Sequence, residues 1–307
     1  MNLYFAPLEG ITNHVYRNIH ARLFGGCDAY YSPFISPSDN EKIGRKGVKD
    51  ILPENNEGIN LCVQVLTSNA QSFQKFSEKI KALGYDEINL NFGCPSGTVT
   101  GKGRGSGFLR TPDALDKFLE DIFTDRCLKI SVKTRSGFYE HSEMQQLMNI
   151  YNKYPLELLI IHPRVREDFY KGEPDIKTFE ASYKASVNKV CYNGNIFSKE
   201  DYDSIKEKFP LLEGVMIGRG AIANPAIFRE IKGGKRLSSQ ELINFTHILC
   251  ENYNGYLKSD FYTLNKLKEI WLHIAWNFPD DKKLLKSIKK AQKLSDLINA
   301  VENIGEI

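Results

Sequence analysis

The chain of 307 residues is 41% hydrophobic and 26% charged, proportions that are typical of a globular protein with a full hydrophobic core. Its formal net charge of +3, from 41 basic and 38 acidic residues, is too small to indicate a nucleic-acid partner by itself. No apolar run approaches the roughly 18 residues of a membrane-spanning helix, so we expect no integral membrane protein.

Six cysteines, at positions 27, 62, 94, 127, 191 and 250, are widely scattered and never form a CxxC pair. This spacing argues against a disulfide framework or a zinc site. The first residues show neither a basic segment with a long apolar run nor a cleavage site of small residues. We therefore expect a cytoplasmic protein that binds no metal.

Short β-branched or aromatic runs alternate with amphipathic segments over about the first three quarters of the chain. The runs predict strands over 3–8, 29–34, 59–66, 87–94, 129–135, 158–164, 189–194 and 214–220. Between them, helices are predicted over segments such as 12–24, 69–83, 112–123, 198–209 and 224–231. In the second of these helices Phe73, Phe76 and Ile80 recur at spacings of three and four, which gives one apolar face. The continuous apolar run 158–161 is typical of a parallel strand that is buried on both sides.

Eight β/α units in succession predict a TIM (β/α)8 barrel, and a doubly wound open sheet is the alternative. After Gly233-Gly234 the strand signal ends, and helices are predicted over about 239–258, 261–276 and 281–303. We therefore predict a catalytic barrel over 1–235 and a small all-helical domain over 236–307. The last predicted helix carries a basic stripe of Lys282, Lys286, Lys289 and Lys293.

Polar residues follow most of the predicted strands, where a barrel collects its functional groups. Each one alone is explained by a turn or a cap, but their repetition favours a site. Lys133 would be expensive to bury without an anion or an electron-rich ring. Taken alone, His162 is better explained as a core or rim histidine. The Cys94 thiol could act as a proton donor or a nucleophile, or it could be a buried structural thiol. The other five cysteines are interpreted as structural.

The ends of the seventh and eighth strands predict a phosphate cradle. Gly194, Gly218 and Gly220 allow close backbone approach, and Arg219 adds a cation; a simple Asn-Gly turn is the alternative. The glycine-rich segment 101–107 contains no predicted helix start, so it is interpreted as a loop over the site with Lys102 and Arg104 available to phosphates. The chain has no Walker, HExxH or GxSxG motif.

Six segments in order carry a family resemblance: APLEG at 6–10, NLNFGCPS at 89–96, SVKTR at 131–135, IHPR at 161–164, NGNI at 193–196 and IGRGA at 217–221. Together they resemble the tRNA-dihydrouridine synthase family, whose members are FMN-dependent TIM barrels with a helical C-terminal domain. The resemblance covers the whole barrel, and the block around Cys94 is its most specific part. Glu9 and the Asn-Phe-Gly-Cys form are similar to the bacterial C-type subgroup, which acts on position 16 of tRNA.

The resemblance implies NADPH-dependent reduction of uridine to 5,6-dihydrouridine in tRNA. It implies hydride transfer from flavin N5 to C6 and protonation of C5 by Cys94. It implies that Asn91, Arg135, Lys102 and Arg104 contact the substrate. It implies FMN contacts from Pro7, Leu8, Glu9, Gln64, Lys133, His162, Asn193, Gly194, Asn195, Gly218 and Arg219. Many relatives have an acidic residue in place of Asn195, a departure that bears on FMN affinity.

Three other functions are compatible with these residues. One is a flavin barrel that reduces a small molecule, as in a dihydroorotate dehydrogenase-like enzyme or an ene-reductase. The others are dihydrouridine synthesis on another RNA, such as rRNA, and a non-catalytic RNA-binding protein. The helical domain and the basic residues favour tRNA as partner of a monomeric chain. Outside the basic stripe, the expected RNA contacts are Arg45, Lys46, Lys102, Arg104, Arg164, Arg166 and Lys171.

Overall fold

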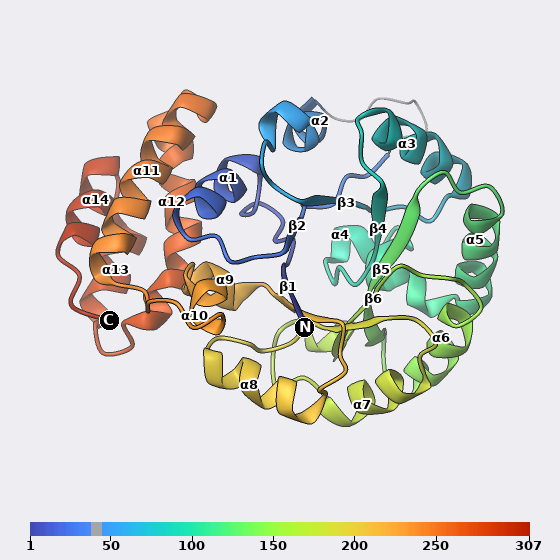
Figure 1. The fold of residues 1–307 in the computed structure, drawn as a ribbon. Helices are drawn as coiled ribbons and strands as arrows, with labels where there is room; N and C mark the ends of the chain where they lie inside the picture. Colours follow the sequence, from blue (N-terminus) through green and yellow to red (C-terminus); the bar gives the residue numbers. More distant parts are fainter. Residues whose placement is uncertain (38–44) are drawn as a thin grey trace.

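The computed structural model describes residues 1–37 and 45–307, with the side chains of α2 described from residue 47 onward. Eight parallel strands pair in chain order into a closed barrel (Figure 1). Because β1 also pairs with β8, the predicted TIM barrel is confirmed and the open sheet is excluded. The strands are β1 (Asn2–Phe5), β2 (Ala29–Tyr31), β3 (Leu61–Val65), β4 (Glu87–Phe92), β5 (Lys129–Gly137), β6 (Leu159–Val165), β7 (Val190–Tyr192) and β8 (Gly214–Ile217).

Several strands end earlier than the sequence predicts. β1 ends at Phe5 because Pro7 has no N–H for the ladder and the N–H of Leu8 donates to Thr12 Oγ1 at 2.9 Å. β5 instead continues to Gly137, with an irregular register against β6 between Arg135 and Gly137. The polar residues after each short strand are therefore free of the ladder and close around the mouth of the barrel.

Helices cover the outside of the barrel in the expected alternation (Figure 1). Capping side chains start several of them: Asn13 and Asn69 each accept a backbone N–H, and Ser198 caps α8 as part of a capping box with Asp201. The predicted helix over 224–231 begins only at Ile227. These helices are α1 (His14–Leu23), α2 (Arg45–Ile51), α3 (Ala70–Ala82), α4 (Gly97–Thr100), α5 (Pro112–Thr124), α6 (Glu143–Tyr151), α7 (Ile176–Ala185), α8 (Lys199–Lys208), α9 (Arg219–Ala223) and α10 (Ile227–Ile231).

Four further helices, α11 (Ser239–Leu257), α12 (Asp260–Ile274), α13 (Lys282–Lys290) and α14 (Leu294–Glu302), gather beside α1 and α9 (Figure 1, orange to red). Trp271 is fully buried among them and donates to Thr246 Oγ1 at 3.1 Å. Tyr253 of α11 donates to Asn13 Oδ1 at 2.9 Å, which ties the helices to the start of α1. In the part of the chain that the structure describes, no helix is long and apolar enough to cross a membrane.

The single final helix predicted over 281–303 was wrong. Asp281 caps α13, the backbone at Ala291 is extended, and Lys293 lies at the N-cap position of α14. Lys268 of α12 donates to the carbonyl oxygens of Lys289 and Ala291, which satisfies the C-terminus of α13. The basic stripe is therefore split between two helices, although its four lysines are all exposed.

Candidate active site

The carboxyl ends of the strands enclose a cavity of about 340 Å³. Its walls are apolar near β1 and β2 and polar elsewhere, as is typical of small-molecule sites. Its lining residues are Ala6, Pro7, Leu8, Glu9, Ile11, Pro33, Phe34, Gln64, Asn91, Gly93, Cys94, Pro95, Lys133, Arg135, His162, Tyr170, Asn193, Gly194, Gly218, Arg219 and His273. The structure thus brings together all of the predicted site residues except Asn195, Lys102 and Arg104.

Cys94 lies at the edge of this cavity, half-buried, on the loop after β4. Asn91 Oδ1 accepts the backbone N–H groups of Gly93 at 3.1 Å and Cys94 at 2.9 Å, which fixes the turn that carries the thiol. Burial raises the pKa of the Cys94 thiol, and the nearby Arg135 and Lys133 oppose this shift only in part. The thiol therefore stays protonated at neutral pH and is suited to donate a proton.

The glycine-rich segment 101–107 holds the backbone of Cys94 through hydrogen bonds. The N–H and the hydroxyl of Ser106 both donate to the carbonyl oxygen of Cys94, at 3.1 and 2.9 Å. Gly105 has φ +57°, and a Cβ there would lie 2.8 Å from the same oxygen. A 3-10 helix, Gly105–Arg110, begins in the segment, so the prediction that no helix starts there was wrong. Lys102 is exposed and Arg104 half-buried, and neither lines the cavity.

Arg135, near the end of β5, is 1% exposed and holds three backbone carbonyls. Its Nε donates to Gly93 O at 2.9 Å, Nη1 to Val165 O at 2.8 Å, and Nη2 to Phe169 O at 2.7 Å. The guanidinium fork therefore links the loop of Cys94 to the loop after β6. A lysine could satisfy only part of this arrangement, because its donors diverge from a single nitrogen.

Lys133 and His162 face the cavity from neighbouring strands. Burial, reinforced by Arg135, lowers the pKa of Lys133 to about 8, and no hydrogen bond joins its Nζ to another described residue. Burial and the surrounding cations hold the pKa of His162 well below its usual range. Arg164 Nη1 donates to His162 Nε2 at 3.0 Å, so the neutral ring carries its proton on Nδ1. The Lys133 ammonium and the His162 Nδ1–H are therefore a cation and a donor that remain available to an anion in the cavity.

The cradle at the ends of β7 and β8 is built differently from the prediction. A Cβ on Gly194 would overlap the Tyr192 hydroxyl at 2.0 Å, so the packing of the chain itself requires glycine there. The Arg219 guanidinium lies over the Tyr170 ring, 4.8 Å from its centroid. Asn195 lies behind Arg219, from which its Oδ1 accepts at 2.9 Å.

Asn195 is held between groups of opposite charge. Its Oδ1 also accepts from Arg164 at 3.2 Å, and its Nδ2 donates to Glu173 at 2.9 Å. Arg164 is 1% exposed, so it serves this network and is not available at the surface as an RNA contact. The structure therefore places Asn195 behind the cavity wall, as a support for Arg219.

Two polar lining residues, His273 and Tyr170, were not among the predicted site residues. His273 comes from α12, and its Nδ1 is buried without a hydrogen-bond partner in the described chain. Burial also lowers the pKa of His273, so the ring is neutral. Tyr170, which is half exposed, follows the 3-10 helix Arg166–Asp168 after β6. Neither residue follows a predicted strand directly, so the strand-end pattern carries no signal for them.

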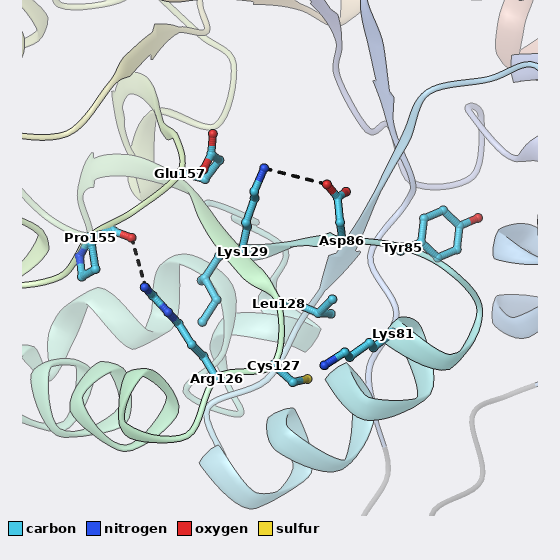
Figure 2. A pocket seen from close by; sticks show the side chains of 10 residues that line it. Lys81, Tyr85, Asp86, Arg126, Cys127, Leu128, Lys129, Pro155 and Glu157 are labelled. Carbon is cyan, nitrogen blue, oxygen red and sulfur yellow. Dashed lines mark hydrogen bonds and ion pairs between the residues drawn. The ribbon is translucent and has the colours of Figure 1, made fainter.

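A second cavity of about 430 Å³ lies at the amino end of β5, opposite Cys94 (Figure 2). Lys129 reaches towards Asp86 there at 3.8 Å, and Arg126 donates to the carbonyl of Pro155 at 3.5 Å. These charged side chains are exposed and paired within the chain. Barrel enzymes carry their chemistry at the other face, so the cavity around Cys94 is the candidate site.

A closed parallel barrel with its titratable groups gathered at the carboxyl ends of the strands defines the class of this protein as a TIM-barrel enzyme. A family model then settles the family. The model described as dihydrouridine synthase (Dus) matches residues 4–306, and the chain belongs to that family.

Curated relatives agree with this assignment, and solved structures share the fold. The chain is 26% identical to a probable tRNA-dihydrouridine synthase of Staphylococcus aureus, over 87% of this chain and 81% of that protein. It is 28% identical to tRNA-dihydrouridine synthase B of Pseudomonas putida, over 82% and 75%. Histamine dehydrogenase from Rhizobium sp. 4-9 shares the fold with a TM-score of 0.57 at 13% identity, over 82% of this chain and 48% of that one. Morphinone reductase in complex with tetrahydroNAD shares the fold with a TM-score of 0.51 at 11% identity, over 77% of this chain and 88% of that one.

Proposed function

We propose that this chain reduces uridine to 5,6-dihydrouridine in tRNA, with Cys94 as the proton donor. The observation that carries the proposal is the half-buried Cys94 thiol at the edge of a cationic cavity, in a chain of the dihydrouridine synthase family. The curated relatives that match over most of the chain are named as tRNA-dihydrouridine synthases. The subgroup that acts on position 16 stays a prediction.

The cavity fits FMN as the cofactor. Its lining carries the cations Lys133, Arg135 and Arg219 against one carboxylate, Glu9, which suits an anionic phosphate. Lys133 would pair with the electron-rich part of the flavin, and His162 would donate from Nδ1. Pro7 and Leu8 would form the apolar wall. When bound and reduced, with NADPH as the reductant, FMN would supply the hydride to C6 of the uracil.

The chain itself supplies the proton and the geometry. Cys94 would give its thiol proton to C5 as the hydride arrives at C6, so the two hydrogens of the product are accounted for. Asn91 and Arg135 hold the loop of Cys94 through Gly93, so the thiol is in place before the substrate enters. Such preorganisation accounts for much of the rate that a positioned general acid provides.

The helices over 236–307 would form the RNA-binding domain beside a catalytic barrel over 1–235. Their exposed lysines on α13 and at Lys293 suit a phosphate backbone. Arg166, Lys171, Lys102 and Arg104 would extend this surface on the barrel. The side chains of Arg45 and Lys46 lie outside the described part of the chain. A uridine must leave its stack to reach the cavity, which requires such a broad surface.

The decisive experiment uses FMN-loaded protein and tRNA from a strain that lacks this gene, with dihydrouridine measured by mass spectrometry. Cys94→Ala should bind FMN with an unchanged absorption spectrum and form dihydrouridine at least about 100-fold more slowly. Cys250→Ala, which removes a half-buried thiol of α11 remote from the cavity, should remain fully active. Full activity of Cys94→Ala would refute its role as acid.

A negative result with the unmodified protein would refute the function itself. If the loaded protein leaves tRNA unchanged but reduces a free unsaturated compound, it is a small-molecule reductase. If it modifies only rRNA, the proposal that tRNA is the substrate is wrong. If the chain binds tRNA with a steep salt dependence but cannot be loaded with FMN, it is an RNA-binding protein.

A further inference from the structure

A line of side-chain hydrogen bonds runs down the inside of the barrel, from the loop of Cys94 towards the opposite end. Asn91 Nδ2 donates to Gln64 Oε1 at 2.7 Å, and Gln64 Nε2 donates to Asn89 Oδ1 at 2.8 Å. Asn89 Nδ2 donates to Ser131 Oγ at 2.9 Å. Ser131 Oγ then donates to Glu87 Oε1 at 2.5 Å. The line therefore connects the catalytic loop to a carboxylate near the amino ends of the strands.

Strand geometry explains how this line forms. Residues at alternate positions of a strand face the same side, so Glu87, Asn89 and Asn91 of β4 all point into the barrel. The register places Gln64 of β3 and Ser131 of β5 on either side of Asn89. From Glu87 to Asn91 the line covers four residue steps of β4, or about 13 Å at the usual rise of a strand. Its three middle members are fully buried.

All the bonds in the line point the same way. At the top, the N–H of Cys94 donates to Asn91 Oδ1, so the amide nitrogen of Asn91 must face Gln64. At the bottom, Ser131 Oγ accepts from Asn89 and donates to Glu87 Oε1, and the Cys62 thiol donates to the same oxygen, so Glu87 is the acceptor that ends the line. Every amide between them is thereby fixed in one of its two orientations. A terminal acceptor at Glu87 and terminal donors at the loop demand the same direction.

Burying the carboxylate at the end of the line costs folding free energy. Glu87 is largely buried, which raises its pKa, while hydrogen bonds from Ser131 and Cys62 oppose the shift. An apolar side chain would fill this layer of the barrel at lower cost. If the two ends of a buried chain of amides required opposite hydrogen-bond directions, two acceptors or two donors would face each other somewhere along it. Glu87 removes that conflict.

We propose that Glu87 and Ser131 are positioning residues that hold Gln64 and Asn91, and through them the loop of Cys94, in the reactive arrangement. This inference rests on the proposed function for its catalytic part. Gln64 and Asn91 both line the cavity, so an amide turned the wrong way would present the wrong group to the ligand and release the N–H groups of the loop.

The first test removes the hydroxyl in the middle of the line. In FMN-loaded protein, Ser131→Ala should lower kcat for dihydrouridine formation about tenfold, with the Kd for tRNA unchanged, because the geometry is loosened and the RNA surface is intact. The matched control is Thr134→Val, which removes a buried hydroxyl from the outer face of the same strand, where it bonds Tyr151 at 3.0 Å. The control should keep kcat within about twofold. Equal losses in the two variants, or an unchanged kcat in Ser131→Ala, would overturn the proposal.

The second test reverses the direction of the line and needs no cofactor or substrate. In Asn91→Asp the carboxylate can only accept from Gln64, so the amides must turn, and Ser131 must donate upward and leave Glu87 facing a lone pair. Glu87→Gln supplies the missing donor. We expect Asn91→Asp to lower the Tm of the ligand-free protein by about 4 °C, and the double variant Asn91→Asp/Glu87→Gln to recover at least half of that loss.

A control separates the effect of hydrogen-bond direction in the line from simple repulsion between the new carboxylate at position 91 and other carboxylates. Glu213→Gln removes another carboxylate at the amino ends of the strands, where Asn2 donates to it at 3.0 Å, outside the line. This substitution should not rescue Asn91→Asp. Rescue by both variants, or by neither, would overturn the directional line. Because thermal unfolding of the ligand-free chain requires neither FMN nor tRNA, this outcome is independent of whether the proposed function is correct.

Discussion

Lys133 offers the most direct measurement of what the cavity is built to hold. Burial lowers its pKa from 10.5 to about 8, a difference of 2.5 units. At about 1.36 kcal/mol per unit, the charged lysine costs the ligand-free protein about 3 kcal/mol at pH 7. We expect Lys133→Met, which keeps most of the volume without the charge, to raise the Tm of the ligand-free protein by about 5 °C at this pH.

The pH dependence gives the prediction its sign. Since the folded pKa lies below the unfolded one, the cost is fully present below pH 8 and disappears as the pH rises to about 10.5. The stability of the unmodified protein should therefore rise over this window relative to Lys133→Met, and the two should converge at its upper end. Thermal unfolding followed by circular dichroism at half-unit pH steps measures the difference.

Binding should reverse the order of the two proteins. An anionic ligand that pairs with Lys133 stabilises only the unmodified chain, so with FMN in large excess the unmodified protein should unfold at the higher temperature. Lys184→Met, at an exposed lysine paired with Glu180, should change the Tm by less than about 1 °C under every condition. A ligand-free Lys133→Met that is no more stable than the unmodified protein at pH 7 would refute the reasoning.

Four further results are expected. Activity of the loaded enzyme should not fall until the pH exceeds the ordinary pKa of a thiol, because burial raises the pKa of Cys94; a decline centred below pH 8 in the pH–rate profile would exclude it as the acid. Arg135→Lys should destabilise the protein by about 3 kcal/mol in urea unfolding, since two of its three carbonyl partners lose a charged donor; a change under 1 kcal/mol would contradict this. Asn195→Asp should weaken FMN binding several-fold in a fluorescence titration, because the new carboxylate faces Glu173 at hydrogen-bond distance; tighter binding would show that the arginines dominate. His273→Ala should weaken FMN or uridine binding about tenfold by calorimetry, while unchanged affinity for both would remove it from the site.

The fold and most of the cavity could be predicted because barrel geometry converts sequence order into position. Once eight β/α units are recognised, every strand end must face the same mouth, so Gln64, Lys133 and His162 meet without any knowledge of their side-chain contacts. The exact ends of the strands could not be predicted in the same way. They depend on local competitors for the ladder, such as the Thr12 hydroxyl that takes the N–H of Leu8.

The residues placed wrongly or missed depend on contacts that are distant in sequence. Position 195 follows a strand, but the two arginines and Glu173 that surround Asn195 come from other segments. His273 enters the cavity because α12 packs beside α9, which no periodicity in the C-terminal region encodes. The break at Ala291 depends on donors from Lys268, a residue of another helix.

The same distinction explains the interior of the barrel. On sequence grounds Asn89 and Ser131 are isolated polar residues in otherwise apolar strands, and each would be judged a cost. Their register makes them neighbours, and a carboxylate at one end with amide donors at the other gives each a defined partner. A fully satisfied polar line of this kind resists rotation of its members more strongly than apolar packing, because every alternative leaves an unpaired buried group. We infer that the barrel tolerates polar residues in its core because they fix the orientation of Asn91, on which the position of Cys94 depends.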